Sequence, residues 1–170
     1  MIIKSNTDSS FVGIEKLKEI HYKQITEFKS WASQDKWERF HQSHYDWWVF
    51  PINRQSSYGM AWVVYENEVD LLKKDSSFLS NYCIGVELVA AAWGWNVQFK
   101  SYNLYPKYGQ YWDNWPIRLY KAASSVKLFG YEDLFESLKY FALDLISQGE
   151  PFSYNGRDLS WLFTTGIEPY

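Results

Sequence analysis

The chain contains one cysteine, Cys83, among 170 residues, so no intrachain disulfide can form and a reducing compartment is expected. It has no cluster of basic residues: 17 Lys and Arg stand against 20 Asp and Glu, for a net charge of −3. General nucleic-acid binding needs clustered cations, so we expect no nucleic-acid partner. No apolar run approaches the roughly 20 residues of a membrane span, and the opening MIIKSNTDSS lacks the apolar stretch of a signal peptide. We therefore expect a soluble cytoplasmic protein without a membrane partner.

The common catalytic signatures are also missing from the sequence. There is no Gly-rich phosphate loop, no His-Glu-x-x-His, no cysteine pair and no Gly-x-Ser-x-Gly. Cys83 falls inside an expected helix and has no basic neighbour that would activate its thiol, so we interpret it as a structural residue. We expect no cofactor, and any catalysis would depend on residues outside these signatures.

Aromatic residues are abundant instead: ten Trp, 14 Tyr and 11 Phe make up 21% of the chain. Aromatic rings bury large apolar areas, and they also form flat surfaces on which sugars, bases or peptides stack. Composition favours an aromatic core over a stacking surface, and both interpretations stay open at this level.

Apolar periodicity predicts the fold class. We predict one compact all-α domain over residues 1–170, with five to six helices, an aromatic-rich core and little or no sheet. The predicted helices cover residues 14–31, 34–50, 67–74, 76–93, 116–129 and 131–149, with one further turn at 158–163. Residues 1–12 are polar and are expected to be frayed.

The second of these helices carries the most unusual stretch, HYDWWVFPI. Ser33 is expected to be its N-cap, and Pro51 ends it because proline disfavours helix at the residue before it. We predict one continuous helical stripe, made of Trp37, Phe40, His41, His44, Trp47 and Trp48.

Sequence signals also predict where the later helices begin and end and which of their faces are buried. Asp75 or Ser76 is expected to cap the helix that holds the nearly uncharged VAAAW segment, which we place at the centre of the domain. Pro116 and Gly130 suit the first position and the stop of the following helix. The predicted buried stripes of the last two helices are Ile117, Tyr120, Ser124 and Leu128 in one, and Leu134, Leu138, Phe141 and Leu145 in the other.

Two segments are ambiguous. Residues 60–65, MAWVVY, suit either a short strand or an extended buried segment. Residues 95–115 form the longest irregular stretch, and a tyrosine recurs there at every third position: Tyr102, Tyr105, Tyr108 and Tyr111. This spacing, with Pro106 and Gly109 between the tyrosines, indicates an extended or polyproline-like segment that either wraps the core or has a function of its own.

His41 and His44 lie three positions apart on the second helix and are expected to share a face. With Asp46 or Glu38 they would make part of a metal site, which still requires a ligand from elsewhere in the chain. A histidine that packs on a ring or caps a neighbour needs no such ligand, so we predict no metal site.

A second polar group surrounds the start of the helix at 116–129. It consists of Asp113, Asn114, Arg118 and Lys121. Arg118 and Lys121 are one turn apart, and a helix N-terminus with an arginine suits an anion or phosphate. The alternative is an ordinary helix cap with a salt bridge from Asp113 to Arg118.

The segment YDWWVFP, residues 45–51, resembles the Tyr-x-x-Trp-x-Phe-Pro signature of the conserved N-terminal region of the opioid growth factor receptor family. The features downstream come in a similar order: a Ser-rich loop, two helices of which the second ends in Trp93-Gly94, and an Arg-bearing helix that ends in Leu-x-Gly. The resemblance covers residues 37–146. The chain differs from the family in having Asp46-Trp47 where Ile-Gln is more frequent.

The resemblance implies an all-α domain with a binding role rather than known catalysis. Vertebrate members are described as binding an opioid pentapeptide, and this specificity is not carried over to the present chain. Within the motif, Trp48, Phe50 and Pro51 match its fixed part, and we expect Trp48 and Phe50 in the core. The freer positions, where a ligand would be contacted, are His41, His44, Asp46 and Trp47.

Three functional hypotheses follow. The leading one is a binding module that holds a small polar ligand, or a peptide or protein, in an aromatic-rimmed pocket; its expected contacts are His41, His44, Asp46, Trp47, Asn114, Arg118 and Lys121. The alternative is a hydrolase or transferase for a phosphate- or carboxylate-bearing substrate, with His44 as acid or base, Asp46 as its partner and Arg118 as a clamp. The third is an interaction subunit whose exposed Tyr and Trp contact a protein partner or a second copy.

Overall fold

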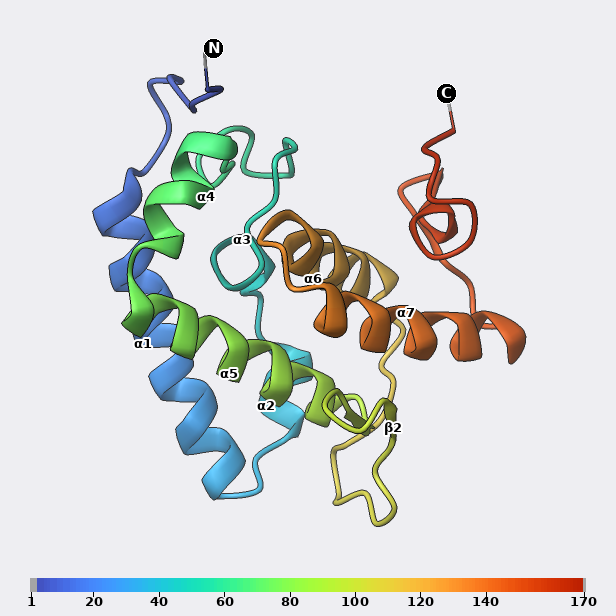
Figure 1. Ribbon diagram of the computed structural model, residues 1–170. Helices are drawn as coiled ribbons and strands as arrows, with labels where there is room; N and C mark the ends of the chain where they lie inside the picture. The colour runs from blue at the N-terminus through green and yellow to red at the C-terminus, as the bar shows by residue number, and fades with distance from the viewer. Residues whose placement is uncertain (1–2, 170) are drawn as a thin grey trace.

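The computed structural model describes residues 3–169, and the described chain is mostly helical (Figure 1). It contains seven α-helices, more than the five to six predicted, because the predicted second helix is divided in two. They are α1 (Ile14–Ser33), α2 (Glu38–Gln42), α3 (Asp46–Val49), α4 (Glu66–Lys73), α5 (Ser76–Ala92), α6 (Pro116–Leu128) and α7 (Glu132–Ser147).

The helices form two packed pairs. Helix α1 runs along α5, with α4 against both, and α6 runs along α7 (Figure 1). The four-residue α3 contacts α1 on one side and α6 on the other, so it sits at the junction of the two pairs. This junction is where the candidate site lies.

Little or no sheet was expected, and the structure adds two small antiparallel sheets. Strand β1 (Trp95–Asn96) pairs with β2 (Ser101–Tyr102), and β3 (Ser153–Tyr154) pairs with β4 (Arg157–Asp158). A single 3₁₀ turn, η1 (Ser160–Leu162), follows β4 at the predicted place.

The predicted aromatic core is confirmed. Buried apolar side chains from both helix pairs form one contiguous cluster, and most of its largest fully buried members are aromatic. Two pairs of polar side chains are hydrogen-bonded within this core: the Tyr82 hydroxyl lies 2.7 Å from the Ser125 hydroxyl, and the Trp95 indole donates to Ser137 over 3.1 Å. These two contacts connect α5 to α6 and β1 to α7. They also give a buried Tyr and a buried Trp the hydrogen-bond partners that such residues need.

Local signals set several helix ends as expected. The Asp75 side chain accepts the backbone N–H of Phe78 at 3.0 Å and so caps α5. Pro116 begins α6, and Gly130 follows its end with a φ of 83° that glycine adopts without strain. Inside α5, Gly85 faces Ile25 of α1: a Cβ added there would lie 2.8 Å from the Ile25 Cδ1 atom. The absence of a side chain therefore lets the two long helices approach closely.

The continuous second helix was a wrong prediction. Ser33 ends α1 instead of capping a new helix, and the chain breaks between α2 and α3, where Ser43 has an extended ψ of 155°. The periodicity of the aromatic residues suited a helix, but carbonyl groups at the end of α2 bond to a side chain from α6 instead, as described below.

The predicted buried stripe of α6 was also wrong. Only Tyr120 of the four predicted residues is buried, while Leu119, Ala122, Ala123 and Val126 are fully enclosed. Helix α6 is covered by α7, by α3 and by β3, so a single stripe does not describe its burial. In α7, by contrast, Leu138, Phe141 and Leu145 are buried as predicted, while Leu134 is half-buried.

Residues 3–12 are attached to the rest of the chain by hydrogen bonds rather than frayed, which corrects another expectation. Residues 1–2 lie outside the described part of the chain. The Asn6 side chain donates to the carbonyl groups of Met60 and Val63, at 2.9 and 2.8 Å, and its backbone N–H donates to Glu68. The polar composition predicted frayed ends, but Asn6 satisfies carbonyl groups of the irregular segment before α4 and so orders the N-terminal segment.

The two ambiguous segments are now resolved. Residues 60–65 form turns followed by an extended buried stretch, in which Val64 donates to the Ile52 carbonyl at 3.1 Å. The tyrosine segment begins in β2 and continues as an irregular loop in which Tyr105 and Tyr108 are 90% and 86% exposed. No helix among residues 3–169 is long and apolar enough to cross a membrane.

Candidate functional site

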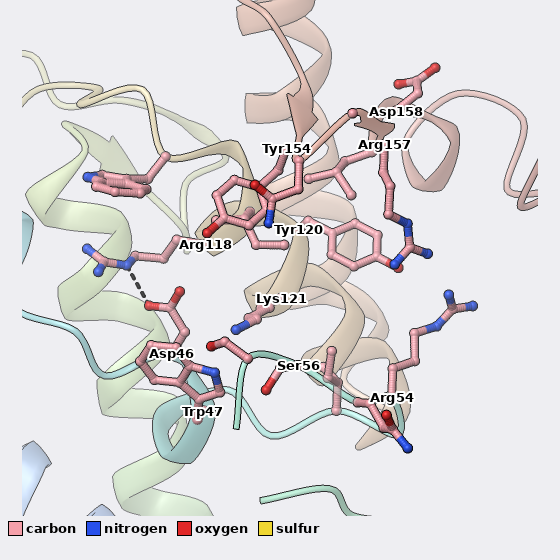
Figure 2. Close-up of a pocket in the computed structure, with 18 of the residues that line it drawn as sticks. Asp46, Trp47, Arg54, Ser56, Arg118, Tyr120, Lys121, Tyr154, Arg157 and Asp158 are labelled. Carbon is pink, nitrogen blue, oxygen red and sulfur yellow. Dashed lines mark hydrogen bonds and ion pairs between the residues drawn. The ribbon is translucent and has the colours of Figure 1, made fainter. Parts of the chain in front are cut away.

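A cleft of about 930 Å³ opens at the junction of the two helix pairs (Figure 2). It lies between α3, the loop at 52–57, the first half of α6, the β3–β4 hairpin and the segment after η1. This volume lies at the upper end of the range typical of small-molecule sites. Segments from three distant parts of the sequence therefore supply its walls.

Aromatic side chains line the cleft on several sides. They are Trp47, Trp115, Tyr120, Tyr154 and Trp161. Trp47 projects from α3 and meets the Tyr58 ring edge-on, with ring centroids 4.5 Å apart. Trp161, from η1, meets Tyr120 edge-on at 6.0 Å. The lining thus offers the flat apolar surfaces on which a ring-bearing ligand stacks.

One wall is held by Arg118, which is only 2% exposed. Its Nε atom donates to Asp46 Oδ1 at 2.7 Å (Figure 2), Nη1 donates to the Phe40 carbonyl at 2.9 Å, and Nη2 donates to the Ser43 carbonyl at 2.6 Å. The guanidinium also lies 4.3 Å from the centre of the Tyr45 ring. Arg118 thus satisfies carbonyl groups at the end of α2 and a carboxylate at the start of α3, which accounts for the helix break.

Lys121, one turn further along α6, has no such partner. The residue is 6% exposed, and its Nζ atom lies 4.6 Å from the centre of the Trp47 ring (Figure 2). It forms no ion pair with any carboxylate of residues 3–169. Burial lowers the pKa of Lys121; the Asp46 charge opposes this shift and the Arg118 charge adds to it.

At the rim, two further cations share one carboxylate. Arg54 and Glu168 form a bidentate ion pair, and the Arg157 Nη2 atom lies 3.4 Å from the same carboxylate. The Arg54 guanidinium also lies over the Trp161 ring, 5.7 Å from its centre. Both arginines are therefore already neutralised in part by the C-terminal segment.

His44 and Asp46 line the cleft with Arg118, but they do not form the expected catalytic arrangement. Asp46 pairs with Arg118, and the exposed His44 contacts the Trp115 ring edge-on at 6.3 Å. Since Arg118 uses Nε and both terminal nitrogens on protein acceptors, it is occupied as a structural residue. The predicted salt bridge from Asp113 to Arg118 does not form.

Asp113 pairs instead with His41, outside the cleft. The His41 Nδ1 atom lies 2.9 Å from Asp113 Oδ2, and its Nε2 atom lies 2.7 Å from the Gly109 carbonyl. Burial alone would lower the pKa of His41, but the carboxylate and the carbonyl outweigh it and raise the pKa above its usual value. His41 and His44 therefore do not share a face, and His41 holds the tyrosine loop against α2.

Of the seven predicted contacts, the cleft brings together His44, Asp46, Trp47, Arg118 and Lys121. His41 and Asn114 do not line it; Asn114 has a φ of 62° and turns the chain before α6. No group of three or more His, Cys, Asp or Glu side chains in the described part of the chain is placed to hold a metal ion.

The sequence analysis missed the far wall of the cleft, which is made by Arg54, Tyr154, Arg157, Trp161 and Glu168. The sequence contains one signal for the hairpin in this wall. The Asn155-Gly156 pair is typical of two-residue hairpin turns, and both residues have the positive φ angles that such a turn requires, 50° and 75°. Arg54 and Glu168 carried no local signal, because their position depends on long-range packing.

No model of a known protein family matches the chain, and neither a curated protein nor a solved structure matches it significantly.

Proposed function

We propose that the protein is a cytoplasmic binding module that holds a small polar, ring-bearing ligand in this cleft. The observation that carries the proposal is the combination of a 930 Å³ opening with aromatic walls from α3, α6 and the β3–β4 region. Most of the chain's aromatic residues lie in or against the core, whereas Trp47, Trp115 and Tyr154 line the cleft without belonging to that cluster. The lining combines these rings with charged and polar side chains, and a concave site that joins apolar surfaces to converging polar groups is the usual form of a ligand site.

The polar groups favour binding over catalysis. A general acid or base needs an orienting partner within hydrogen-bond reach. Asp46 is committed to Arg118 at 2.7 Å, and the contact of His44 within the cleft is the edge of Trp115. The arrangement therefore supports recognition of a ligand rather than proton transfer to it.

We also propose a distant relationship to the conserved region of the opioid growth factor receptor family. It is supported by the placement of the shared motif: Phe50 and Pro51 are buried at the end of α3, and Trp48 packs against the core while donating to Gln24 at 3.1 Å. These are the structural positions of the motif, whereas the variable Trp47 faces the cleft. The relationship would fit a shared scaffold with a different ligand.

The proposal is tested by a thermal-shift screen of the purified protein against nucleotides, sugars, sugar phosphates, aromatic acids and short peptides. A ligand at about 100 times its dissociation constant should stabilise the protein by about 2.7 kcal/mol, or several degrees. The Trp47→Ala variant should still fold and should lose this response.

Trp112→Ala is the matched control, because Trp112 lies outside the cleft and, like Trp47, has a buried indole nitrogen without a hydrogen-bond partner. It should be less stable than the wild type but should keep the ligand-induced shift. A flat screen together with a mass above the 20.3 kDa monomer would instead identify the cleft region as a protein interface and refute the proposal.

A further inference from the structure

Lys121 is unusual among the lysines of the described chain because it is buried without a carboxylate. Lys18, Lys100 and Lys107 are more exposed and each form an ion pair, with Asp75, Glu136 and Asp35 respectively. The other buried cation, Arg118, has Asp46 and two carbonyl groups. The Lys121 side chain is largely enclosed, and its ammonium group opens on the cleft without a carboxylate partner. A single ring contact with Trp47 offsets only part of the hydration that the enclosed lysine loses.

We propose that Lys121 is the receptor for the anionic group of the ligand, and that the cleft binds a small flat-ring molecule that carries one anionic group. The inference rests on the proposed binding function and adds the chemical class of the ligand to it. The anionic group would be a carboxylate or a phosphate ester, placed against Lys121, with the ring on the aromatic walls.

The charge balance of the cleft supports a single anionic group. Four cationic side chains line it, Arg54, Arg118, Lys121 and Arg157, against the three carboxylates of Asp46, Asp158 and Glu168. Arg118 is paired with Asp46, and the two rim arginines share Glu168. Asp158 accepts from the backbone and hydroxyl of Ser160. Of the four cations, Lys121 is the one that forms no ion pair with a carboxylate of residues 3–169.

The position of Lys121 supports the same ligand class. Its ammonium group lies over the face of Trp47, so an anion that pairs with it is held beside an aromatic wall (Figure 2). Trp115 and Tyr154 line the same cleft and offer further ring surface. A molecule with its charge next to a flat ring would use both features at once, and a neutral ring would use only the second.

Two fluorescent probes separate these contributions. Anilinonaphthalene sulfonate carries one negative charge, and N-phenylnaphthylamine has the same ring system without the sulfonate. We expect the wild-type protein to bind both, with the anionic probe at least about tenfold tighter, since a charge-assisted hydrogen bond contributes at least that factor. Raising the salt concentration from about 0.05 M to about 0.5 M should weaken binding of the anionic probe more than that of the neutral one.

Lys121→Met removes the charge and keeps most of the aliphatic stem. We expect about tenfold weaker binding of the anionic probe, unchanged binding of the neutral probe and an unchanged or higher melting temperature, because the variant no longer buries a charge. Lys121→Arg should restore most of the preference. The control is Lys127→Met on the same helix, where an exposed lysine lies over the Phe135 ring outside the cleft, and it should change neither affinity.

Equal loss of both probes in Lys121→Met would overturn the inference, since it would mean that Lys121 only shapes the apolar wall. No preference of the wild type for the anionic probe, at any salt concentration, would overturn it without requiring a variant. If Trp47→Ala abolishes the binding of neither probe, or if neither probe binds at all, the proposed binding function itself fails. This inference then fails with it.

A competition experiment distinguishes the two sources of charge. Displacement of the anionic probe by phenylacetate supports a carboxylate ligand, and displacement by phenyl phosphate supports a phosphate ester. Phenylacetamide, which is neutral, should displace it poorly. Equal displacement by phenylacetamide and phenylacetate would overturn the assignment of an anionic ligand.

Discussion

Arg118 and Asp46, which are 72 positions apart in the chain, meet in a buried ion pair with Nε 2.7 Å from Oδ1. The pair joins α6 to α3, and the same guanidinium satisfies carbonyl groups at the end of α2. It therefore fixes the direction in which Trp47, the next residue after Asp46, enters the cleft.

Replacing Arg118 with Met should lower the free energy of unfolding by about 3–5 kcal/mol, because Asp46 would be left buried without its partner. Asp46→Leu combined with Arg118→Met should cost less than the sum of the single changes, since the double variant buries no lone charge. Urea denaturation of the four proteins measures this coupling. A loss of less than about 1 kcal/mol in Arg118→Met would show that the pair does not hold the wall.

His21 should make the protein sensitive to acid. It is 1% exposed, neither ring nitrogen has a hydrogen-bond partner, and burial lowers its pKa to about 3. The unfolded chain binds a proton at this residue near pH 6.5, so between about pH 6.5 and pH 3 the unfolded state holds more protons than the folded state. Stability should therefore fall with decreasing pH by up to about 1.4 kcal/mol per unit through this residue.

The matched variants for that prediction are His21→Leu and His44→Leu. His21→Leu should flatten the decline in unfolding free energy between pH 6.5 and pH 4 and should be neutral or stabilising at pH 7, because it removes buried unpaired polar atoms. His44 is exposed, so His44→Leu should keep the wild-type slope. Identical slopes in all three proteins would contradict the assignment to His21.

His41 should have the opposite pH dependence. Both of its ring nitrogens face acceptors, Asp113 and the Gly109 carbonyl, so the doubly protonated ring is favoured and its pKa is raised. The protonated His41 ring therefore stabilises the folded state fully at pH values below the pKa of histidine in the unfolded chain, near 6.5. This stabilisation is lost as the pH rises through the raised pKa of His41 in the folded protein. Hydrogen exchange of residues 103–112, corrected for intrinsic rates, should be slower at pH 6 than at pH 8.5.

Asp113→Asn should lower the His41 pKa, as measured by nuclear magnetic resonance titration, and should remove the pH dependence of that loop's exchange. His44→Gln is the control and should leave the loop unchanged. A His41 pKa below its usual value in the wild type would contradict the ion pair with Asp113.

Gly85→Ala should destabilise the protein although alanine is the better helix former. The new Cβ atom would lie 2.8 Å from Ile25 Cδ1 and 3.5 Å from Val49 Cγ1. Helix propensity favours alanine by about 1 kcal/mol, but overpacking costs about 1–3 kcal/mol. Thermal denaturation should show a smaller penalty for Gly85→Ala in an Ile25→Val background, which lacks the Cδ1 atom. A stabilised single variant would refute the close approach of α1 and α5.

The binding of an anionic probe should weaken at alkaline pH earlier than the ordinary lysine pKa near 10.4 would require. Burial lowers the pKa of Lys121, and Arg118 adds to that shift, so the charge is lost below the usual range. The measurement is the affinity for anilinonaphthalene sulfonate from pH 7 to pH 10, with N-phenylnaphthylamine as the control. Parallel loss of both probes would indicate unfolding rather than titration of Lys121.

Local sequence was sufficient for much of the helical framework. Asp75, Pro116 and Gly130 mark helix ends through hydrogen bonds and backbone angles that involve only a few neighbouring residues. The predominance of helix and the aromatic core followed from periodicity and composition. Five of the seven candidate site residues line one cleft, because the second and fifth predicted helical regions do meet there.

Partner choice, by contrast, was decided by the tertiary structure. Arg118 is compatible in sequence with Asp113, five positions before it, but pairs with Asp46; Asp113 pairs with His41. The break between α2 and α3 exists because Arg118, which is distant in the sequence, satisfies the carbonyl groups of Phe40 and Ser43. No local sequence pattern predicts these hydrogen bonds. Charged and polar groups have many chemically acceptable partners, and only the packing of the whole chain selects among them. Sequence alone thus determined which residues are candidates, and the fold determined that Lys121 is the buried cation left without a carboxylate.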